Sequence, residues 1–186
     1  MTDINRFGPE LALLVAAGLI IIIDALLPLA GREMVRRGRL ISVVLGLAGV
    51  AASIGWSVIL VAADERGQAF KGMMTVDDFS LFFNFLFAGI CGMIILASVD
   101  FLERNRFQAE YIALILASTT GMMLMASSID LVSIFVALEL QAISLYVLVG
   151  FRKDVRSSEA SLKYLLLGAV STALTLYGMA YLFGLS

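Results

Sequence analysis

Six long apolar stretches decide what this chain can fold into. Hydrophobic residues make up 61% of its 186 positions and charged residues only 15%, and almost all of the charge lies between the stretches. About 20 consecutive apolar residues are enough for one helix to cross the hydrocarbon core of a bilayer. We therefore predict a membrane protein with six spans, at residues 11–30, 40–63, 79–99, 111–129, 131–151 and 160–186.

The spans are predicted to be helices, because a backbone in lipid must satisfy its hydrogen bonds within a helix or a closed barrel. Barrel strands are about ten residues long and alternate in polarity, whereas these stretches are roughly twice as long and apolar on all sides. The leader "MTDINRFGPE" has no basic region typical of a signal peptide, so the first stretch is expected to remain as a span. We predict an all-α bundle that forms one transmembrane domain over residues 1–186.

The basic residues predict the orientation of the bundle. The positive-inside rule assigns the more basic set of loops to the cytoplasm, which here means the loops after spans one, three and five. The N-terminus, and the C-terminus after six spans, are then expected outside. The basic side has Arg32, Arg36, Arg37, Arg39, Arg104, Arg106, Arg152, Lys153 and Arg156, and the other side has only Arg6, Arg66 and Lys71.

The residues that usually hold cofactors are scarce in this chain. It has no histidine and one cysteine, Cys91, which lies inside the third span. It contains neither a CxxC pair nor a phosphate-binding glycine loop. We therefore expect it to hold no metal, NADH, flavin or iron–sulfur cluster, and to bind a lipid bilayer rather than nucleic acid.

Glu139 is the most informative residue, because it lies in the middle of the apolar stretch "IFVALELQAISLYVLVGF". It is roughly 18 Å from the basic end of its helix, too deep for its short side chain to reach water. Placing such a group there costs about 2.5–3.5 kcal/mol, so it should face the bundle or a wet cavity. We predict that it binds or relays protons, and a protonated structural strut is the alternative. Tyr146 on the same helix face, and Gln141 and Ser144 on neighbouring stripes, are possible supporting polar groups.

Lys163 follows the segment "RSSEAS", in which Ser158 is a credible N-cap. A helix starting near Glu159 would place Lys163 one turn inside the membrane, in the favourable i,i+4 order for a pair with Glu159. A relay lysine and a surface-paired lysine that reaches the interface both remain open. The levels of Lys163 and Glu139 differ by roughly 10 Å, so the two should not touch.

The remaining polar and small residues predict structural contacts. Asp24 lies near the basic end of the first span, where it could pair with Arg32 or anchor the helix at the interface. Asn84 is expected to make a hydrogen bond between helices. Small residues four apart, which allow helices to approach closely, occur at Ala51 with Gly55, Ala88 with Gly92 and Gly168 with Thr172.

Residues 128–184 resemble the antiporter-like membrane subunits of respiratory complex I, the proton-pumping NADH:quinone oxidoreductase, and in particular its N-type subunits. Mid-helix Glu139 and the segments "LYVLVGFR", "SSEASLKY" and "YGMA" stand in the order and spacing of that family. The stretches "PELALLVAAGLIIIIDALLP" and "DDFSLFFNFLFAGI" are also similar to its first and third spans. The resemblance therefore covers essentially the whole chain.

The resemblance implies roles for two residues. Glu139 corresponds to the family's fifth-helix glutamate, which pairs with a lysine on a broken seventh helix, and Lys163 corresponds to its sixth-helix lysine. Family members are longer, so this sequence resembles an N-terminal portion, and the cation for Glu139 is expected beyond residue 186.

At the level of function, the resemblance implies a proton-translocating subunit without redox chemistry of its own. Its expected partners are other complex I membrane subunits and, through them, the hydrophilic redox arm. A bacterial inner membrane is the expected location, with a mitochondrial or thylakoid membrane as the alternative. A non-catalytic membrane scaffold and a subunit of a stand-alone cation/proton antiporter are the competing functions.

Overall fold

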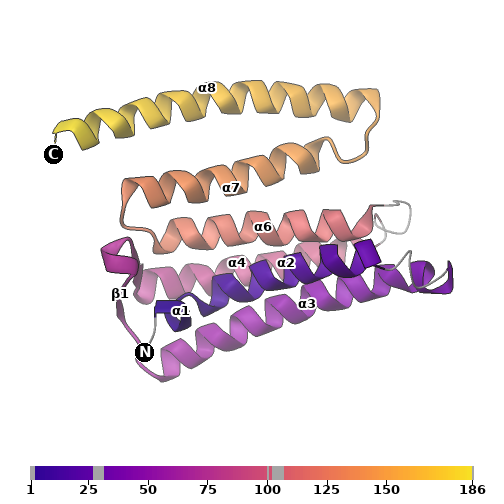
Figure 1. The fold of residues 1–186 in the computed structure, drawn as a ribbon, viewed down its shortest axis with the longest axis horizontal. Coiled ribbons are helices and arrows are strands. Elements are labelled where there is room, and N and C mark those ends of the chain that lie inside the picture. The colour runs from indigo at the N-terminus through magenta and orange to yellow at the C-terminus, as the bar shows by residue number, and fades with distance from the viewer. Residues whose placement is uncertain (1–2, 27–31, 100, 102–106, 186) are drawn as a thin grey trace.

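The computed structural model describes residues 3–26, 32–99, 101 and 107–185, with side chains for 4–26, 40–99, 101 and 107–185 (Figure 1). Six of its helices are long and apolar enough to cross a membrane, α3 doing so over Leu40–Ala62. This confirms the predicted all-α fold with six candidate spans. The described helices are α1 (Asp3–Arg6), α2 (Gly8–Leu26), α3 (Arg32–Ala62), α4 (Asp78–Ala97), α6 (Gln108–Ser127), α7 (Leu131–Val149) and α8 (Val155–Leu185).

The helices lie side by side, with α7 and α8 stacked outward from a compact group formed by α2, α3, α4 and α6 (Figure 1). The apolar core lies within that group, where Leu13, Ile95, Ile112 and Leu116 are completely buried. By contrast, none of the described residues of α8 is buried. Helix α8 packs against α7 and exposes apolar side chains on its other sides, as a lipid-facing or partner-facing helix would.

Small residues allow the helices to approach closely, as expected in a membrane bundle. A Cβ added at Gly49 would overlap the side chain of Ala16 on α2, and one added at Gly168 would overlap the Tyr146 hydroxyl. Gly92 lies against Val50, in agreement with the predicted contact at Ala88 and Gly92. The prediction for Ala51 and Gly55 was wrong: both are exposed and nothing lies within 4 Å of a Cβ at Gly55, because that face of α3 points away from the core.

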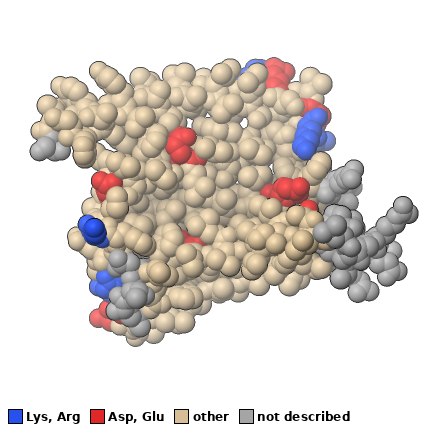
Figure 2. Space-filling view, in the orientation of Figure 1, with Lys and Arg blue, Asp and Glu red and all other residues tan. Residues whose placement is uncertain are grey.

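One end of the bundle, here called the hairpin end, carries the N-terminus and an antiparallel hairpin of β1 (Gly67–Ala69) and β2 (Met74–Val76). The hairpin is joined to the α6–α7 connection, where the N–H of Ile129 donates to the carbonyl of Met73 over 2.9 Å. The opposite end carries the α7–α8 connection (Figure 1). Figure 2 shows charged side chains mainly at these two ends, with few on the face between them. Which end faces the cytoplasm stays a prediction.

Helix α8 begins at Val155, so the prediction of a start near Glu159 with Ser158 as N-cap was wrong. Asp154 caps the helix instead: its carboxylate accepts from the N–H of Ser157 over 2.7 Å, and the Ser157 hydroxyl accepts from the N–H of Asp154 over 3.2 Å. This reciprocal pair satisfies two N–H groups, which explains why the helix begins a turn earlier. The pKa of Asp154 is lowered, mainly by the hydrogen bond from the Ser157 N–H and to a smaller degree by the one with the Ser157 hydroxyl.

Candidate functional site

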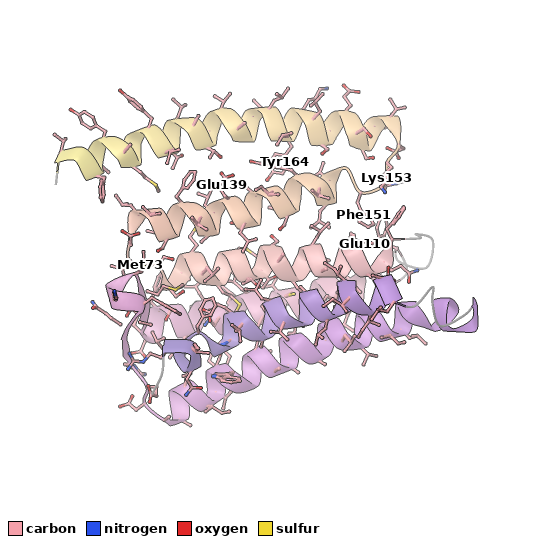
Figure 3. The ribbon with its side chains drawn as sticks, viewed as in Figure 1. Met73, Glu110, Glu139, Phe151, Lys153 and Tyr164 are labelled. Carbon is pink, nitrogen blue, oxygen red and sulfur yellow. The ribbon has the colours of Figure 1, made fainter. Side chains whose placement is uncertain are left out.

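Glu139 lies near the middle of α7, on the side of that helix that faces α8 (Figure 3). Its neighbours on the same helical stripe, Phe135 and Tyr146, both meet α8. Phe135 lines an apolar cavity with Leu176 of α8 among others, and the Tyr146 ring lies 5.0 Å from that of Tyr164 in an edge-to-face arrangement. Glu139 therefore stands between two points at which α7 and α8 are in contact.

The surroundings of Glu139 leave its carboxyl group incompletely satisfied. The residue is half-buried, and its Oε1 atom is buried without a hydrogen-bond partner among the described residues. Tyr146 lies opposite Tyr164, and α7 and α8 run antiparallel. Glu139 lies roughly 10 Å from Tyr146 along the α7 axis, so it is level with residues 171–172 of α8. The nearby part of α8 offers hydroxyl groups from Ser171 and Thr172 rather than a cation. A buried acceptor in such a place can take up a proton or receive a charged partner.

Lys163 is exposed, with 70% of its side chain accessible, and its Nζ lies 2.5 Å from Glu159 Oε1. The i,i+4 pair expected between these two residues is therefore present. Exposed pairs of this kind contribute only about 0.3–0.5 kcal/mol. Because Lys163 is next to Tyr164, it lies roughly 10 Å along the helix axis from the level of Glu139. The structure thus brings Lys163 to Glu159 and not to Glu139.

The other predicted polar residues fall on different sides of α7. Tyr146 shares the α8-facing side with Glu139, and its carbonyl accepts from the Ser161 hydroxyl over 2.8 Å. Ser144 is buried and donates to the carbonyl of Leu140 over 2.8 Å. Gln141 lies where α7 meets α6, since a Cβ at Gly121 would be 2.8 Å from its backbone nitrogen. Only Tyr146 is therefore placed along the stripe that contains Glu139.

Asp24 is half-buried near the end of α2. The side chain of Arg32, its expected partner, lies outside the described residues. The predicted pair between them remains a prediction.

A second buried carboxyl, Glu10, was missed by the sequence reasoning. It is 3% exposed, in the first turn of α2, and its Oε1 lies 3.5 Å from Nδ2 of Asn84 on α4, which is 4% exposed. This confirms the prediction that Asn84 bonds between helices and identifies its partner. Glu10 was assigned to a polar leader because the first span was expected to begin at Leu11. The helix begins at Gly8, and the "GPE" sequence was the available signal, since proline is favoured in the first turn.

Metal-ligating side chains do not converge anywhere in the described part of the chain. There, no three residues among His, Cys, Asp and Glu lie close enough together to hold a metal ion.

Comparison with known proteins places the chain in a specific context. Residues 128–186 match the family model described as "NADH:quinone oxidoreductase/Mrp antiporter, TM". The chain is 40% identical to NADH-quinone oxidoreductase subunit N of Dehalococcoides mccartyi over 98% of its own length and 36% of that protein. It is also 40% identical to subunit N 2 of Koribacter versatilis, over 98% of the chain and 37% of that protein. The chain thus spans about a third of the length of these curated relatives.

Solved structures agree with this. A chain of respiratory complex I from Thermus thermophilus matches 94% of this chain with 26% identity and a TM-score of 0.72, over 37% of its own length. A chain of the archaeal membrane-bound sulfane sulfur reductase matches 98% of this chain with a TM-score of 0.77, over 37% of its own length. Its 20% identity supports likeness of fold alone. Both matches are chains of respiratory membrane complexes.

Proposed function

Because the chain belongs to the antiporter-like family of NADH-quinone oxidoreductase N subunits, we propose that it contributes part of an intramembrane proton path to a proton-translocating enzyme of that kind. The chain is a multi-pass membrane protein, and its bacterial relatives support the plasma membrane as its location. Its partners in this proposal are other membrane subunits of the complex and, through them, the hydrophilic redox arm. NADH, flavin and iron–sulfur clusters belong to those partners.

The single observation that carries the proposal is the half-buried carboxyl of Glu139 between α7 and α8, with one oxygen unsatisfied among the described residues. Burial favours the protonated form of a carboxyl group, and a nearby cation favours the ionised form. A cation that approaches and withdraws would therefore make Glu139 release and take up a proton. The lysine implied by the family resemblance, beyond residue 186, is the proposed cation.

Lys163 is proposed as a relay or charge-setting group on the side of the α7–α8 connection. Its pair with Glu159 keeps it at the periphery, so its influence on Glu139 would pass through water or through the protonation of intervening groups. The same pair equally supports the alternative in which Lys163 anchors α8 at the membrane surface. Tyr146, on the stripe between the two, is the side chain best placed to support a water between them.

The test is Glu139→Gln in the intact complex reconstituted in sealed vesicles. Proton pumping per electron transferred is expected to fall several-fold, because the amide cannot take up or release a proton at working pH, while assembly of the complex is unchanged. Asp64→Asn is the matched control, since the Asp64 carboxyl is 90% exposed at the hairpin end. Normal pumping by the Glu139 variant would overturn the proposal.

Two other functions compete with this one. If the chain is a scaffold that only spaces neighbouring helices, Glu139 is a permanently neutral strut, and infrared titration would find its carboxyl protonated across the working pH range. The matched family model also names the Mrp antiporter, which supports a stand-alone cation/proton antiporter as the other candidate. Affinity purification separates these cases, because a complex I subunit should bring hydrophilic redox proteins with it and an antiporter subunit should not.

A further inference from the structure

We propose that Glu10 and Asn84 form a proton-binding site at the hairpin end of the bundle, in which the proton is shared between the Glu10 carboxyl and one enclosed water. The site is separate from Glu139, on other helices, and it does not rest on the function proposed for that residue. Its chemistry is the reversible protonation of a single buried carboxyl group.

Four parts of the chain enclose the site. Glu10 comes from the first turn of α2 and Asn84 from α4, and both border a cavity of about 10 Å³, roughly the room needed by one water molecule. The hairpin covers the cavity with Phe70 and Thr75, and α6 contributes Ser127. Since the hairpin lies at the end of the bundle (Figure 1), it separates Glu10 from the aqueous phase by a thin layer of protein.

Counting donors and acceptors shows that a hydrogen donor is required. The Asn84 amide nitrogen donates to Glu10 Oε1 over 3.5 Å, which leaves Glu10 Oε2 and Asn84 Oδ1 as buried acceptors without a donor among the described residues. If the Asn84 amide were flipped, its oxygen would face the Glu10 oxygen, and a hydrogen donor would still be needed between them. A protonated carboxyl supplies one O–H donor and a water supplies two. One water can therefore satisfy both orphaned oxygens when Glu10 is ionised, and a proton on the carboxyl can supply a donor when Glu10 is neutral, so the cavity accommodates either charge state.

One charged neighbour of Glu10, Arg6, borders the same cavity. Its guanidinium is only partly committed elsewhere, because its buried Nε has no hydrogen-bond partner among the described residues. Its Nη1 donates to the carbonyl of Gln68 over 2.5 Å, and its Nε lies 3.5 Å from Glu65 Oε2. The groups that face the cavity from α3, α4, α6 and the hairpin, among them Leu60, do not titrate in the working range.

Two opposing influences act on the Glu10 carboxyl. Removal from water disfavours a carboxylate, whereas the unpaired N–H groups in the first turn of a helix favour one. A carboxyl balanced in this way, beneath a thin cover, is suited to exchange protons with the hairpin-end aqueous phase.

The test is an infrared titration of the intact complex, comparing the wild type with Glu10→Gln. A carboxyl C=O band that disappears as the pH rises is expected in the wild type and should be absent from the variant. Asn84→Leu should move the midpoint of that band, because it removes the amide that touches the carboxyl, and it reads out the site even if the Glu10 variant assembles poorly. Asp64→Asn is the control and should leave the band unchanged.

Two results would overturn the proposal. One is a difference spectrum between the wild type and Glu10→Gln that contains no titrating carboxyl band. The other is a midpoint that depends on sodium concentration at constant ionic strength, which would assign the cavity to a metal cation. Neither readout depends on whether Glu139→Gln loses proton pumping. The failure of one proposal would therefore leave the other standing.

Discussion

Glu10 and Glu139 are carboxyl groups of the spanning helices that lie in quite different surroundings. Glu10 is almost completely buried and touches an amide from another helix, whereas Glu139 is half-buried at the outer pair of helices. A fully enclosed carboxyl must be satisfied by what the cavity itself contains. A carboxyl on an open helix pair can instead be satisfied by a group that comes from elsewhere. The local surroundings therefore favour an enclosed proton site at Glu10 and a partner-dependent switch at Glu139.

Asp154 provides a prediction at the scale of one residue. Asp154→Ala should fray the first turn of α8, because it removes the acceptor for the Ser157 N–H. Asp154→Asn should have a much smaller effect, since asparagine also caps helices well. The measurement is hydrogen exchange of the amides at the start of α8. Equal protection in the alanine and asparagine variants would show that the cap contributes nothing.

The same cap predicts a dependence on pH. The pKa of Asp154 is lowered in the folded protein, so its stabilising contribution is complete above the ordinary aspartate pKa of about 3.9. That contribution is lost as the pH falls through the lower, folded value. Exchange at the first turn of α8, corrected for the intrinsic pH dependence of exchange, should therefore increase in strong acid in the wild type. In Asp154→Asn it should not change, and an equal increase there would contradict the assignment.

At the scale of helices, most elements could be predicted because their signal is local. A stretch of about 20 apolar residues identifies a span from its own composition, and all six were found in this way. Their ends could not be found by the same means. The start of α8 is capped by a reciprocal bond between Asp154 and Ser157, and the first turn of α2 contains a buried polar residue, Glu10. Hydropathy detects neither.

Contacts between helices were predicted less well than the helices themselves. A pair of small residues shows that a helix can be approached closely, but not which face the bundle uses. Ala51 and Gly55 accordingly lie on an exposed face. Gly121 makes the close contact to α7 without having been singled out. Only one member of the Glu10–Asn84 pair was predicted. The asparagine stood out within an apolar span, whereas its partner 74 residues earlier did not.

Gly121 provides a prediction at this scale. Gly121→Ala should destabilise the contact between α6 and α7 by about 1–3 kcal/mol, the usual cost of overpacking, because a Cβ would lie 2.8–2.9 Å from backbone atoms of Gln141 and Ala137. Gly89→Ala is the matched control, since nothing lies within 4 Å of a Cβ there. It should be neutral or stabilising by up to about 1 kcal/mol. Thermal unfolding of the detergent-solubilised protein measures both, and equal midpoints would contradict the inferred contact.

At the scale of the whole molecule, the connections are sorted between two ends. The hairpin and the α6–α7 connection lie at one end, and the α7–α8 connection lies at the other (Figure 1). The described basic residues of the α7–α8 region, Arg152, Lys153 and Arg156, are exposed, as side chains that face water or lipid headgroups should be. This arrangement agrees with the prediction that successive loops alternate between the two ends of the bundle. Which end faces the cytoplasm is a separate question for measurement.

The positive-inside rule predicts that the α7–α8 connection faces the cytoplasm. Both cysteine sites for the test are built on a Cys91→Ser background, which removes the one native thiol. Lys153→Cys should react with a membrane-impermeant maleimide only after the cells are opened, and Asp64→Cys should react in intact cells, since both positions are exposed. Labelling both variants after opening the cells shows that each thiol is accessible. The reverse pattern in intact cells would invert the predicted orientation and place the Glu10 cavity on the cytoplasmic side.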